Sequence, residues 1–341
     1  MTAADNSAVV PWREAMEQAL YGPGGFFVRH APRAHFRTST VASPLFASAV
    51  AGVVERVDEM LGSPAVLDIV DVGAGRGELL TGVGPALPPG LRSRARFTAV
   101  ERAPRPDGLP RWIGWRARPP SGITGLLVAT EWLDNVPVDV AERDDAGERR
   151  LVLVDPATGA EAPGGAVTAT DAAWLDRWWP LREAGLRAEV GHTRDTAWAQ
   201  AVGGLTRGAA LTVDYGHVTA ARPVAGTLTG YRYGRQVPPV PDGSCDVTAH
   251  VAMDAVAAAG ERVAGCAPQL LDQRTALRRL GVAGTRPPLT LATTDPAGYV
   301  RALAAASRAA ELTDADGLGA HYWLIQPVGM PAGWTPLADA G

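Results

Sequence analysis

The strongest hydrophobic pattern of the chain lies in residues 65–80, which read AVLDIVDVGAGRGELL. Its first part is a short apolar run without the polar and apolar alternation of a half-exposed strand. The apolar positions of this run are Val66, Leu67, Ile69, Val70 and Val72. The pattern is typical of a parallel strand buried on both faces of a sheet, and it predicts an α/β fold.

Three glycines, Gly73, Gly75 and Gly77, follow this strand, and a helix is predicted to begin at Glu78. Glycine allows positive φ and has no Cβ, so a ligand can lie directly against the backbone at the carboxyl end of the strand. The free N–H groups of the helix start face the same place. The pattern predicts a site for a nucleotide-type cofactor, although a tight turn without a ligand would use the same glycines.

Two acidic residues distinguish between the nucleotide-type cofactors. Asp71 precedes the glycines, where a carboxylate would repel a pyrophosphate and attract a cationic amino-acid head group. Glu101 ends the next predicted strand, 95–100, where its carboxylate can accept hydrogen bonds from both hydroxyls of a ribose. Together these residues resemble the S-adenosylmethionine (SAM) dependent methyltransferases of the Rossmann-like class. They disfavour a dinucleotide oxidoreductase, whose glycine turn lacks an acid at the position of Asp71.

Predicted strands and helices alternate along most of the chain. An amphipathic helix is predicted over residues 11–20, and a second over 45–60 with Ser43 as its N-cap and Pro44 at its first position. Further strands are predicted at 112–115, 126–130, 209–213 and 322–327. We therefore predict a Rossmann-like class I methyltransferase fold with a doubly wound, mostly parallel sheet, an N-terminal helical arm and an inserted cap.

The cap is predicted from the middle of the chain. Residues 141–165 are charged and rich in turns, which predicts a hairpin and not a core element. Trp174, Trp178 and Trp179 follow at helical spacing, and they are interpreted as a packed helix face, with a face lining the acceptor cleft as the alternative. A further helix is predicted over 187–205, capped by Thr193 or Asp195. The predicted parts are a 1–60 arm or lid, a 61–140 and 206–330 SAM-binding core, and a 141–205 cap.

Composition narrows the function classes. The 341 residues are 46% hydrophobic and 20% charged, as in a globular chain long enough for one large domain or two. A net charge of −4 gives no reason to expect nucleic acid as a partner. No apolar stretch is long enough to span a membrane, and residues 1–6 lack a signal-peptide pattern, so we expect a cytoplasmic protein without membrane insertion.

Cysteine and histidine usage adds two expectations. Cys245 and Cys266 are expected to be reduced thiols, since they have neither partners nor metal-ligand spacing. The histidines show no metal spacing either, and we predict no metal. A homodimer is consistent with the sequence.

A series of motifs outside the glycine turn resembles one particular methyltransferase family. In chain order they are MEQALYGPGGFF (16–27), FRTS (36–39), SPLF (43–46), GLLVATEWLDNVPV (125–138), ALTVDYG (210–216), GTLTGY (226–231) and CDVTAHV (245–251). They are similar to motifs of the MidA family, also known as the DUF185 group, over about residues 11–328. Its mitochondrial members methylate an arginine of a respiratory complex I subunit, which implies a protein acceptor here.

The resemblance also bears on the cofactor lid. It implies that Thr38 and Ser39 close over the methionine part of SAM. The chain departs from the family pattern at His35, at Thr40-Val41 and at Thr130. The acceptor therefore need not be the mitochondrial one.

Candidate catalytic residues follow the predicted fourth strand. Glu131 comes directly after this strand, and Asp134 lies three residues later. A pair of carboxylates suits a guanidinium acceptor, because bidentate hydrogen bonds orient the planar fork and offset its charge. For Asp134 the alternative is a cap of the following turn, which Asn135 and Pro137 shape.

A second group of candidates lies later in the chain. Asp214 and Tyr215 end the 209–213 strand, where the Tyr hydroxyl could hold an acceptor or the SAM carboxylate. His250 precedes a helix for which Asp246 or Thr248 is the expected cap. His250 could act as a general base toward a hydroxyl or carboxylic acid, or it could have a structural role.

Three functions are consistent with these patterns. The first is a SAM-dependent methyltransferase acting on a protein arginine. The second is a small-molecule methyltransferase, for which a closed pocket lined by Trp174, Trp178 or Tyr231 would be evidence. The third is an assembly or interaction factor that retains SAM binding.

Trp115 is a candidate for stacking near the adenine, with a core role as the alternative.

Overall fold

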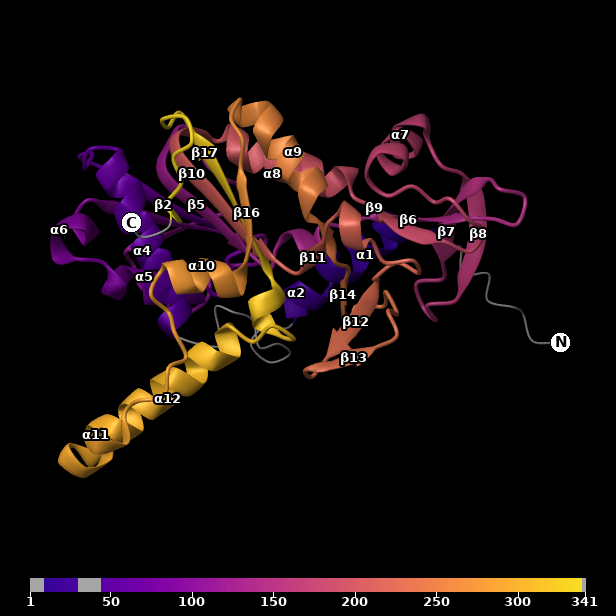
Figure 1. Cartoon of the computed structure of the whole chain (residues 1–341). Helices are drawn as coiled ribbons and strands as arrows, with labels where there is room; N and C mark the ends of the chain where they lie inside the picture. The colour runs from indigo at the N-terminus through magenta and orange to yellow at the C-terminus, as the bar shows by residue number, and fades with distance from the viewer. Residues whose placement is uncertain (1–8, 30–43, 339–341) are drawn as a thin grey trace. The chain divides into compact units, whose positions relative to one another are not determined.

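A seven-stranded sheet carries the glycine turn in this computed structural model, which describes residues 9–29 and 44–338. Its strand order is β16-β17-β10-β5-β2-β3-β4, and Figure 1 labels β2, β5, β10, β16 and β17. The strands from β10 to β4 are parallel, and β17 runs antiparallel to both β10 and β16. Their bounds are β2 Leu67–Val72, β3 Ala95–Val100, β4 Ile113–Arg116, β5 Ile123–Thr130, β10 Leu205–Asp214, β16 Gln269–Asp272 and β17 Tyr322–Val328. The mostly parallel sheet predicted from the sequence is present.

The chain divides into two compact units. Unit 1 comprises residues 1–36, 132–199 and 216–259, and unit 2 comprises 37–131, 200–215 and 260–341. The sheet with the glycine turn belongs to unit 2. Helix α1 (Trp12–Tyr21) lies in unit 1 and α4 (Pro44–Met60) in unit 2, so the segments expected to form one N-terminal arm belong to different units.

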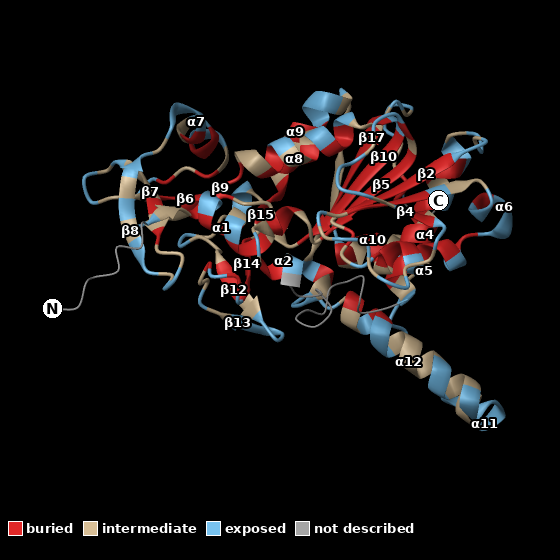
Figure 2. Cartoon of the chain, turned by 180° about the vertical axis from the view of Figure 1, so that it is seen from behind, coloured by how far each residue is buried: buried red, intermediate tan, exposed pale blue. Residues whose placement is uncertain are grey.

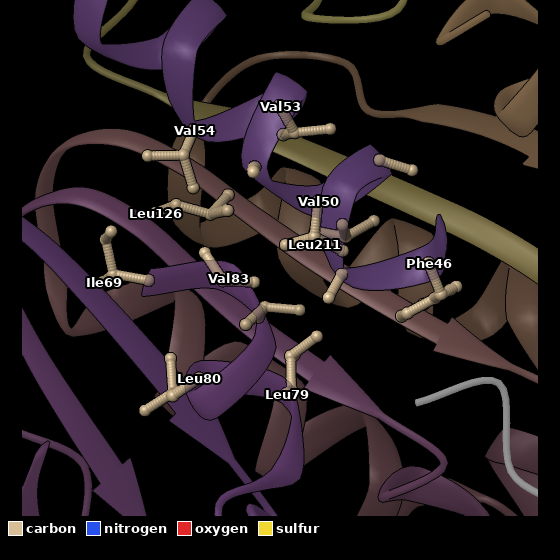
Figure 3. Packing of buried hydrophobic residues seen from close by; sticks show 14 of the residues in the cluster. Phe46, Val50, Val53, Val54, Ile69, Leu79, Leu80, Val83, Leu126 and Leu211 are labelled. Atoms are coloured by element: carbon tan, nitrogen blue, oxygen red, sulfur yellow. The ribbon is translucent and has the colours of Figure 1, made fainter. Parts of the chain in front are cut away.

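Helices α4 and α5 (Glu78–Ala86) cover the strands of the unit 2 sheet, as Figure 3 shows. Apolar residues recur along α4 every three or four positions, so one stripe of the helix faces the sheet. The residues that meet there are Phe46, Val50, Val53, Val54, Leu79, Leu80, Val83, Ile69, Leu126 and Leu211, all buried. Helix α4 begins at Pro44, as predicted, whereas its expected N-cap, Ser43, lies outside the described residues.

Two glycines allow the central strands of unit 2 to lie close together. Gly125 of β5 has a φ of 146°, and a Cβ on it would overlap the main-chain oxygen of Asp68 in β2. Gly208 of β10 has a φ of 132°, and a Cβ there would overlap the oxygen of Gly125. Both positions therefore require glycine for space as well as for backbone conformation.

Replacing Gly125 with alanine is expected to lower the free energy of unfolding by about 3 kcal/mol or more, because the two strands must separate to admit the methyl group. Gly122→Ala is the matched control, since Gly122 also has a positive φ of 75°, but a methyl group added there would meet no atom within 4 Å. It should cost only about 1 kcal/mol, for the backbone conformation alone. Urea unfolding of both variants measures the difference, and equal losses would contradict the packing argument.

Unit 1 contains an antiparallel sheet of five strands. The strands are β1 Val10–Pro11, β6 Asp139–Arg143, β7 Arg149–Val154, β8 Glu161–Ala166 and β9 Arg187–Val190. The hairpin predicted over 141–165 is present, but the expectation that it is not a core element is wrong. Val140, Ala141, Val152 and Val154 are all buried, because the hairpin pairs with β1 and β9 and is covered on both faces.

The two faces of this sheet have separate apolar cores. On one face Trp12, Met16 and Leu20 of α1 pack with Val140 and Val154. On the other face α7 (Ala169–Trp178) places Trp174 and Leu175, with the following Trp179, against Ala141, Ala188 and Val190. Trp174 and Trp179 are buried, which supports the interpretation of the tryptophan cluster as a packed helix face.

Two predicted helix starts are wrong. Residues 187–190 form β9, and α8 (His192–Gly203) begins after it, so Thr193 and Asp195 lie within its first turn and do not cap it. Asp246 and Thr248 form β14 (Asp246–Thr248), whereas α9 starts only at Met253 and runs to Ala264. In both places a short strand precedes the helix, and only its pairing partners elsewhere in the chain reveal it.

The remaining elements are short or peripheral. They are α2 Phe26–Arg29, α6 Pro89–Arg92, α10 Gln273–Arg279, α11 Leu289–Thr294, α12 Pro296–Leu312, β11 Gly216–His217, β12 Thr229–Arg232, β13 Arg235–Val237 and β15 Val251–Ala252. Figure 2 shows the central strands β2, β5 and β10 of the unit 2 sheet mostly buried, and most of α11 and α12 intermediate or exposed. Among the described helices, none combines the length and the apolar composition needed to cross a membrane.

Candidate functional site

The glycine turn adopts a conformation that only glycine takes readily. Gly73, Gly75 and Gly77 have φ values of 72°, 56° and 83°, so all three lie in the left-handed region. Gly77 is the N-cap of α5, which begins at Glu78 as predicted. The turn therefore presents backbone and the N–H groups of a helix start at the carboxyl end of β2.

Glu101 lies against this turn. One carboxylate oxygen, Oε2, accepts a hydrogen bond from the Gly75 N–H at 3.1 Å. The other, Oε1, accepts from the N–H groups of Arg102 at 2.6 Å and Ala103 at 3.1 Å. Three backbone donors thus hold the carboxylate at the ends of β2 and β3, which is where a ribose-binding acid is expected in this class of fold.

Asp71 lies at the end of β2 and is only 2% exposed. Burial raises the pKa of this carboxyl well above its usual range, and the negative charges of Glu101 and Glu78 raise it further. Three acids around one turn disfavour a further negative charge and favour a cation. These acidic groups fit SAM, which carries a sulfonium, an ammonium group and a ribose diol.

Glu131 occupies a strained position directly after β5. Its φ of 49° is in the left-handed region, which costs a non-glycine residue about 1–2 kcal/mol. Its N–H donates to the oxygen of Val213 at 2.8 Å, so Glu131 continues the pairing of β5 with β10. Such outliers cluster at functional sites. The conformation therefore supports, on independent grounds, the prediction that Glu131 is functional.

The end of β10 brings three further residues to this edge of the unit 2 sheet. Asp214 is fully buried and lies next to the position of Glu131 in the strand register, one residue after the Thr130–Val213 pair. The following residue, Tyr215, has its ring 5.6 Å from that of His321. The sequence predicts Asp214 and Tyr215 at this edge but gives no signal for His321. His321 directly precedes β17, whose first residue, Tyr322, pairs with Asp214.

Asp134 and His250 lie together in unit 1. Asp134 is 3% exposed, and its Oδ2 accepts a hydrogen bond from the Thr248 hydroxyl at 2.8 Å. Arg194 of α8 links the two segments, because its guanidinium donates to the main-chain oxygen of Asp134 at 2.6 Å and to that of His250 at 2.8 Å. Asp134 belongs to a 3₁₀ turn, Leu133–Asn135, so these contacts fit a role in shaping the turn. A catalytic role for Asp134 or His250 stays a prediction.

Sequence reasoning missed Arg194, which is 1% exposed and also donates to the oxygen of Val136 at 3.2 Å. An arginine in the first turn of an amphipathic helix carries no local sign of burial. Its partners are main-chain oxygens from segments about sixty residues away, and such contacts leave no pattern in the sequence.

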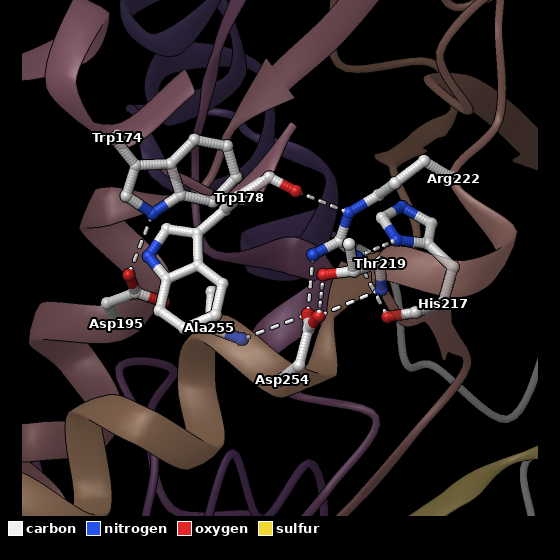
Figure 4. Close-up of polar contacts among 8 residues, drawn as sticks. All are labelled: Trp174, Trp178, Asp195, His217, Thr219, Arg222, Asp254 and Ala255. Atoms are coloured by element: carbon white, nitrogen blue, oxygen red, sulfur yellow. Dashed lines mark hydrogen bonds and ion pairs between the residues drawn. The ribbon is translucent and has the colours of Figure 1, made fainter. Parts of the chain in front are cut away.

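A second polar cluster that the sequence did not predict surrounds His217 (Figure 4). Its Nδ1 lies 2.6 Å from Nη1 of Arg222, which can only donate, so Nδ1 accepts. Arg222 in turn contacts Asp254 at 2.5 Å, and Asp254 accepts from the Thr219 N–H at 2.8 Å. Burial, first, and the positive charge of Arg222 lower the pKa of His217 to about 3. His217 is therefore neutral at physiological pH.

This burial predicts a pH dependence of stability. The folded pKa of His217 lies below its unfolded value of about 6.5, so the unfolded chain binds the extra proton and stability falls as the pH drops below that value. The free energy of unfolding should fall by up to about 1.4 kcal/mol per pH unit from this residue, well below pH 6.5. His217→Asn keeps an acceptor for Arg222 and should show a shallower slope between pH 6.5 and 5 in urea unfolding. An unchanged slope would contradict the assignment.

Other predicted site residues divide into two groups. Thr38 and Ser39, like His35 and Thr40-Val41, lie outside the described residues. Trp115 donates from Nε1 to the Ala103 oxygen at 3.1 Å and packs partly buried against the unit 2 core, which fits its alternative role. Trp174 donates to Oδ2 of Asp195 at 2.8 Å within the unit 1 core (Figure 4).

Two solved structures are similar to the chain over nearly its whole length. The crystal structure of a COG1565 superfamily member from Burkholderia thailandensis, bound to S-adenosyl-homocysteine, is 25% identical with a TM-score of 0.79 and covers 97% of this chain and 91% of that chain. A native crystal structure of a COG1565 superfamily protein from the same organism is 25% identical with a TM-score of 0.78, and covers 98% and 91%. The predicted class I methyltransferase fold is confirmed.

Comparison with protein-family models identifies the chemistry, whereas comparison with curated proteins gave no match. The model of the family described as "Putative S-adenosyl-L-methionine-dependent methyltransferase" matches residues 87–271. The predicted cofactor, SAM, is thereby confirmed, and the bound S-adenosyl-homocysteine of the similar structure is the product that SAM leaves after transfer. Because the match covers more than half of the chain, the chain belongs to this family of SAM-dependent methyltransferases.

Proposed function

We propose that this methyltransferase transfers the methyl group to a guanidinium nitrogen of an arginine in a partner protein. The observation that carries the proposal is the line of acids at one edge of the unit 2 sheet. Asp71, Glu101, Glu131 and Asp214 lie at or next to the carboxyl ends of four strands, β2, β3, β5 and β10, that are neighbours in the sheet.

This charge distribution favours a cationic acceptor over a neutral or anionic one. When bound, SAM supplies an electrophilic methyl group on a sulfonium. Carboxylates at this edge would accept hydrogen bonds from the planar guanidinium and fix its orientation, and charge-assisted bonds of this kind are about twice as strong as neutral ones. We assign the orienting role to Glu131, and its left-handed backbone directly after β5 supports this assignment.

The same carboxylates can accept the proton that the acceptor nitrogen loses on methylation. Transfer forms a bond between the acceptor nitrogen and the methyl carbon while the carbon–sulfur bond breaks, and the methylated nitrogen then loses one N–H proton. A carboxylate that already accepts this N–H can hold the proton before it leaves to solvent. Asp214, next to Glu131 in the register and fully buried, is the second candidate for this role.

We also propose that the chain is a member of the MidA (DUF185) group within its family. The ordered motifs from residue 16 to residue 251 support this assignment. In that case Asp71, the three turn glycines and Glu101 hold SAM, and Thr38 and Ser39 close over it. The acceptor would be a protein, as in the mitochondrial members.

The test is methyl transfer from labelled SAM to proteins of a cell extract. Purified full-length chain should label a protein, and acid hydrolysis of that protein should release the label as methylarginine. The Glu131→Gln variant provides the control. Label in a small-molecule fraction, or in an alkali-labile methyl ester, would overturn the arginine assignment in favour of another acceptor.

A further inference from the structure

A groove in unit 1 has no role in the chemistry described so far. It has a volume of about 360 Å³, which is near the lower end for small-ligand pockets. It lies on the face of the five-stranded sheet that carries α1. The lining residues that matter are Trp12, Glu161, Arg187, Glu189, Leu228 and Pro239.

The strand register places charges on this face. Val140 of β6 pairs with Glu189 of β9, and Glu142 pairs with Arg187, so these four side chains lie on one side of the sheet. The residues between them, such as Ala188, pack on the other side against α7. An alternating strand of this kind normally faces water with its polar side, yet Glu189 is only 3% exposed.

The positive charge of Arg187 is already matched by partners. Its guanidinium makes bonds of 2.8 and 2.7 Å to the two carboxylate oxygens of Glu161, and its Nε lies 3.6 Å from Glu142. Two acids, Glu161 and Glu189, line the groove with one arginine, Arg187, so the groove has a negative net charge. An anionic ligand would find no available cation among these residues.

Glu189 keeps capacity to accept a further hydrogen bond. Its Oε1 accepts from the N–H groups of Thr227 at 2.6 Å and Leu228 at 2.9 Å. Within the described part of the chain, the donor to its Oε2 is the Thr227 hydroxyl alone, at 3.1 Å. An ionised carboxylate offers about four acceptor positions, so Oε2 can accept from a cationic donor as well.

Apolar surface accompanies this carboxylate. Trp12, Leu228 and Pro239 line the same groove, and Trp12 is fixed by its Nε1 bond to Glu161 at 2.8 Å. Apolar walls beside a buried acid suit a side chain with a hydrocarbon stem and a cationic end, which buries the stem and pairs the charge.

We propose that this groove binds a basic side chain, arginine or lysine, of an extended segment of the protein acceptor. The identification of the partner as the acceptor rests on the proposed function, whereas the preference for a basic side chain rests on the groove alone. Such a site would select acceptors with a second basic residue at some distance from the methylated arginine.

The test uses a defined probe, the peptide acetyl-Gly-Arg-Gly-Arg-Gly-amide, and its counterpart in which neutral citrulline replaces arginine. Binding to the full-length Glu131→Gln protein without SAM is measured by isothermal titration. We expect the arginine peptide to bind at least tenfold more tightly than the citrulline peptide. Equal affinity for the two peptides would overturn the proposal.

A matched pair of variants then locates the binding. Ala225 is an exposed residue of the groove, so changes there should leave the fold intact. Ala225→Arg adds a competing cation and should weaken binding of the arginine peptide at least tenfold, whereas Ala225→Glu should not weaken it. Glu189→Gln, checked by thermal unfolding, should weaken it similarly. Unchanged affinity in Ala225→Arg would overturn the site.

The outcome separates this inference from the proposed function. The titration involves no methyl transfer, so peptide binding that responds to Ala225 supports the groove even if labelled extract yields no methylarginine. In the reverse case, methylarginine would appear while the two peptides bind equally, and only the groove would be rejected.

Discussion

Replacing Glu101 with glutamine is expected to weaken SAM binding about 100-fold, because two hydrogen bonds from the ribose diol to an ionised carboxylate would be lost or reversed. Three backbone N–H groups surround this carboxylate, at 2.6, 3.1 and 3.1 Å. Because both carboxylate oxygens accept from backbone N–H groups, the NH₂ group of a glutamine would face at least one of these donors in either orientation of the amide. In both orientations one set of hydrogen bonds fails.

Isothermal titration with SAM and with S-adenosylhomocysteine measures this effect. Asp107→Asn is the matched control, since Asp107 is an exposed acid six residues later in the same loop. It should leave both affinities within a factor of about two, as expected for an exposed charge. An affinity in Glu101→Gln equal to that of the control would show that Glu101 does not hold the ribose.

The affinities for the two ligands also test the role of Asp71. S-adenosylhomocysteine lacks the sulfonium charge of SAM but keeps its ammonium group and ribose. If the acids around the glycine turn favour the sulfonium, SAM binds more tightly than its product. Asp71→Asn should then reduce the difference between the two affinities. If they favour only the ammonium group, Asp71→Asn should weaken both ligands alike.

The glycine turn of the proposed cofactor site follows from local sequence. A buried strand, three glycines and a helix start within residues 65–80 define the turn, and each of them depends on near neighbours in the chain. The second acid, Glu101, is also predictable, because parallel strands in this fold end at the same edge. Local propensity and the global fold agree here, which is the condition under which sequence reasoning succeeds.

The second unit cannot be predicted in the same way. The short strands β9 and β14 each precede a helix, and the sequence predicts them as part of that helix or as its cap, since three or four residues carry no usable periodicity. Their identity as strands depends on pairing with β6 and β12. Glu189 and Arg194 gain their roles through such distant contacts, and nothing in their immediate sequence indicates burial.

Replacing Glu131 with glutamine is expected to lower kcat for methyl transfer about 100-fold while the affinity for SAM stays unchanged. A carboxylate that hydrogen-bonds the acceptor contributes to acceptor binding and to its orientation for transfer, and loss of orientation alone can cost about 100-fold in rate. Initial rates with labelled SAM and the acceptor fraction, together with titration of SAM, separate the two parameters. Weakened SAM binding would instead place Glu131 in the cofactor site.

The backbone at Glu131 gives a further test of whether this residue is kept for function. Glycine adopts a φ of 49° without strain, so Glu131→Gly relieves about 1–2 kcal/mol in the folded state and loses about 0.5–1 kcal/mol through greater freedom of the unfolded chain. The free energy of unfolding should therefore stay within about 1 kcal/mol of the wild type or rise, while methyl transfer falls as far as in Glu131→Gln. A loss of stability above about 2 kcal/mol would instead identify Glu131 as a structural residue whose side-chain contacts outweigh its strain.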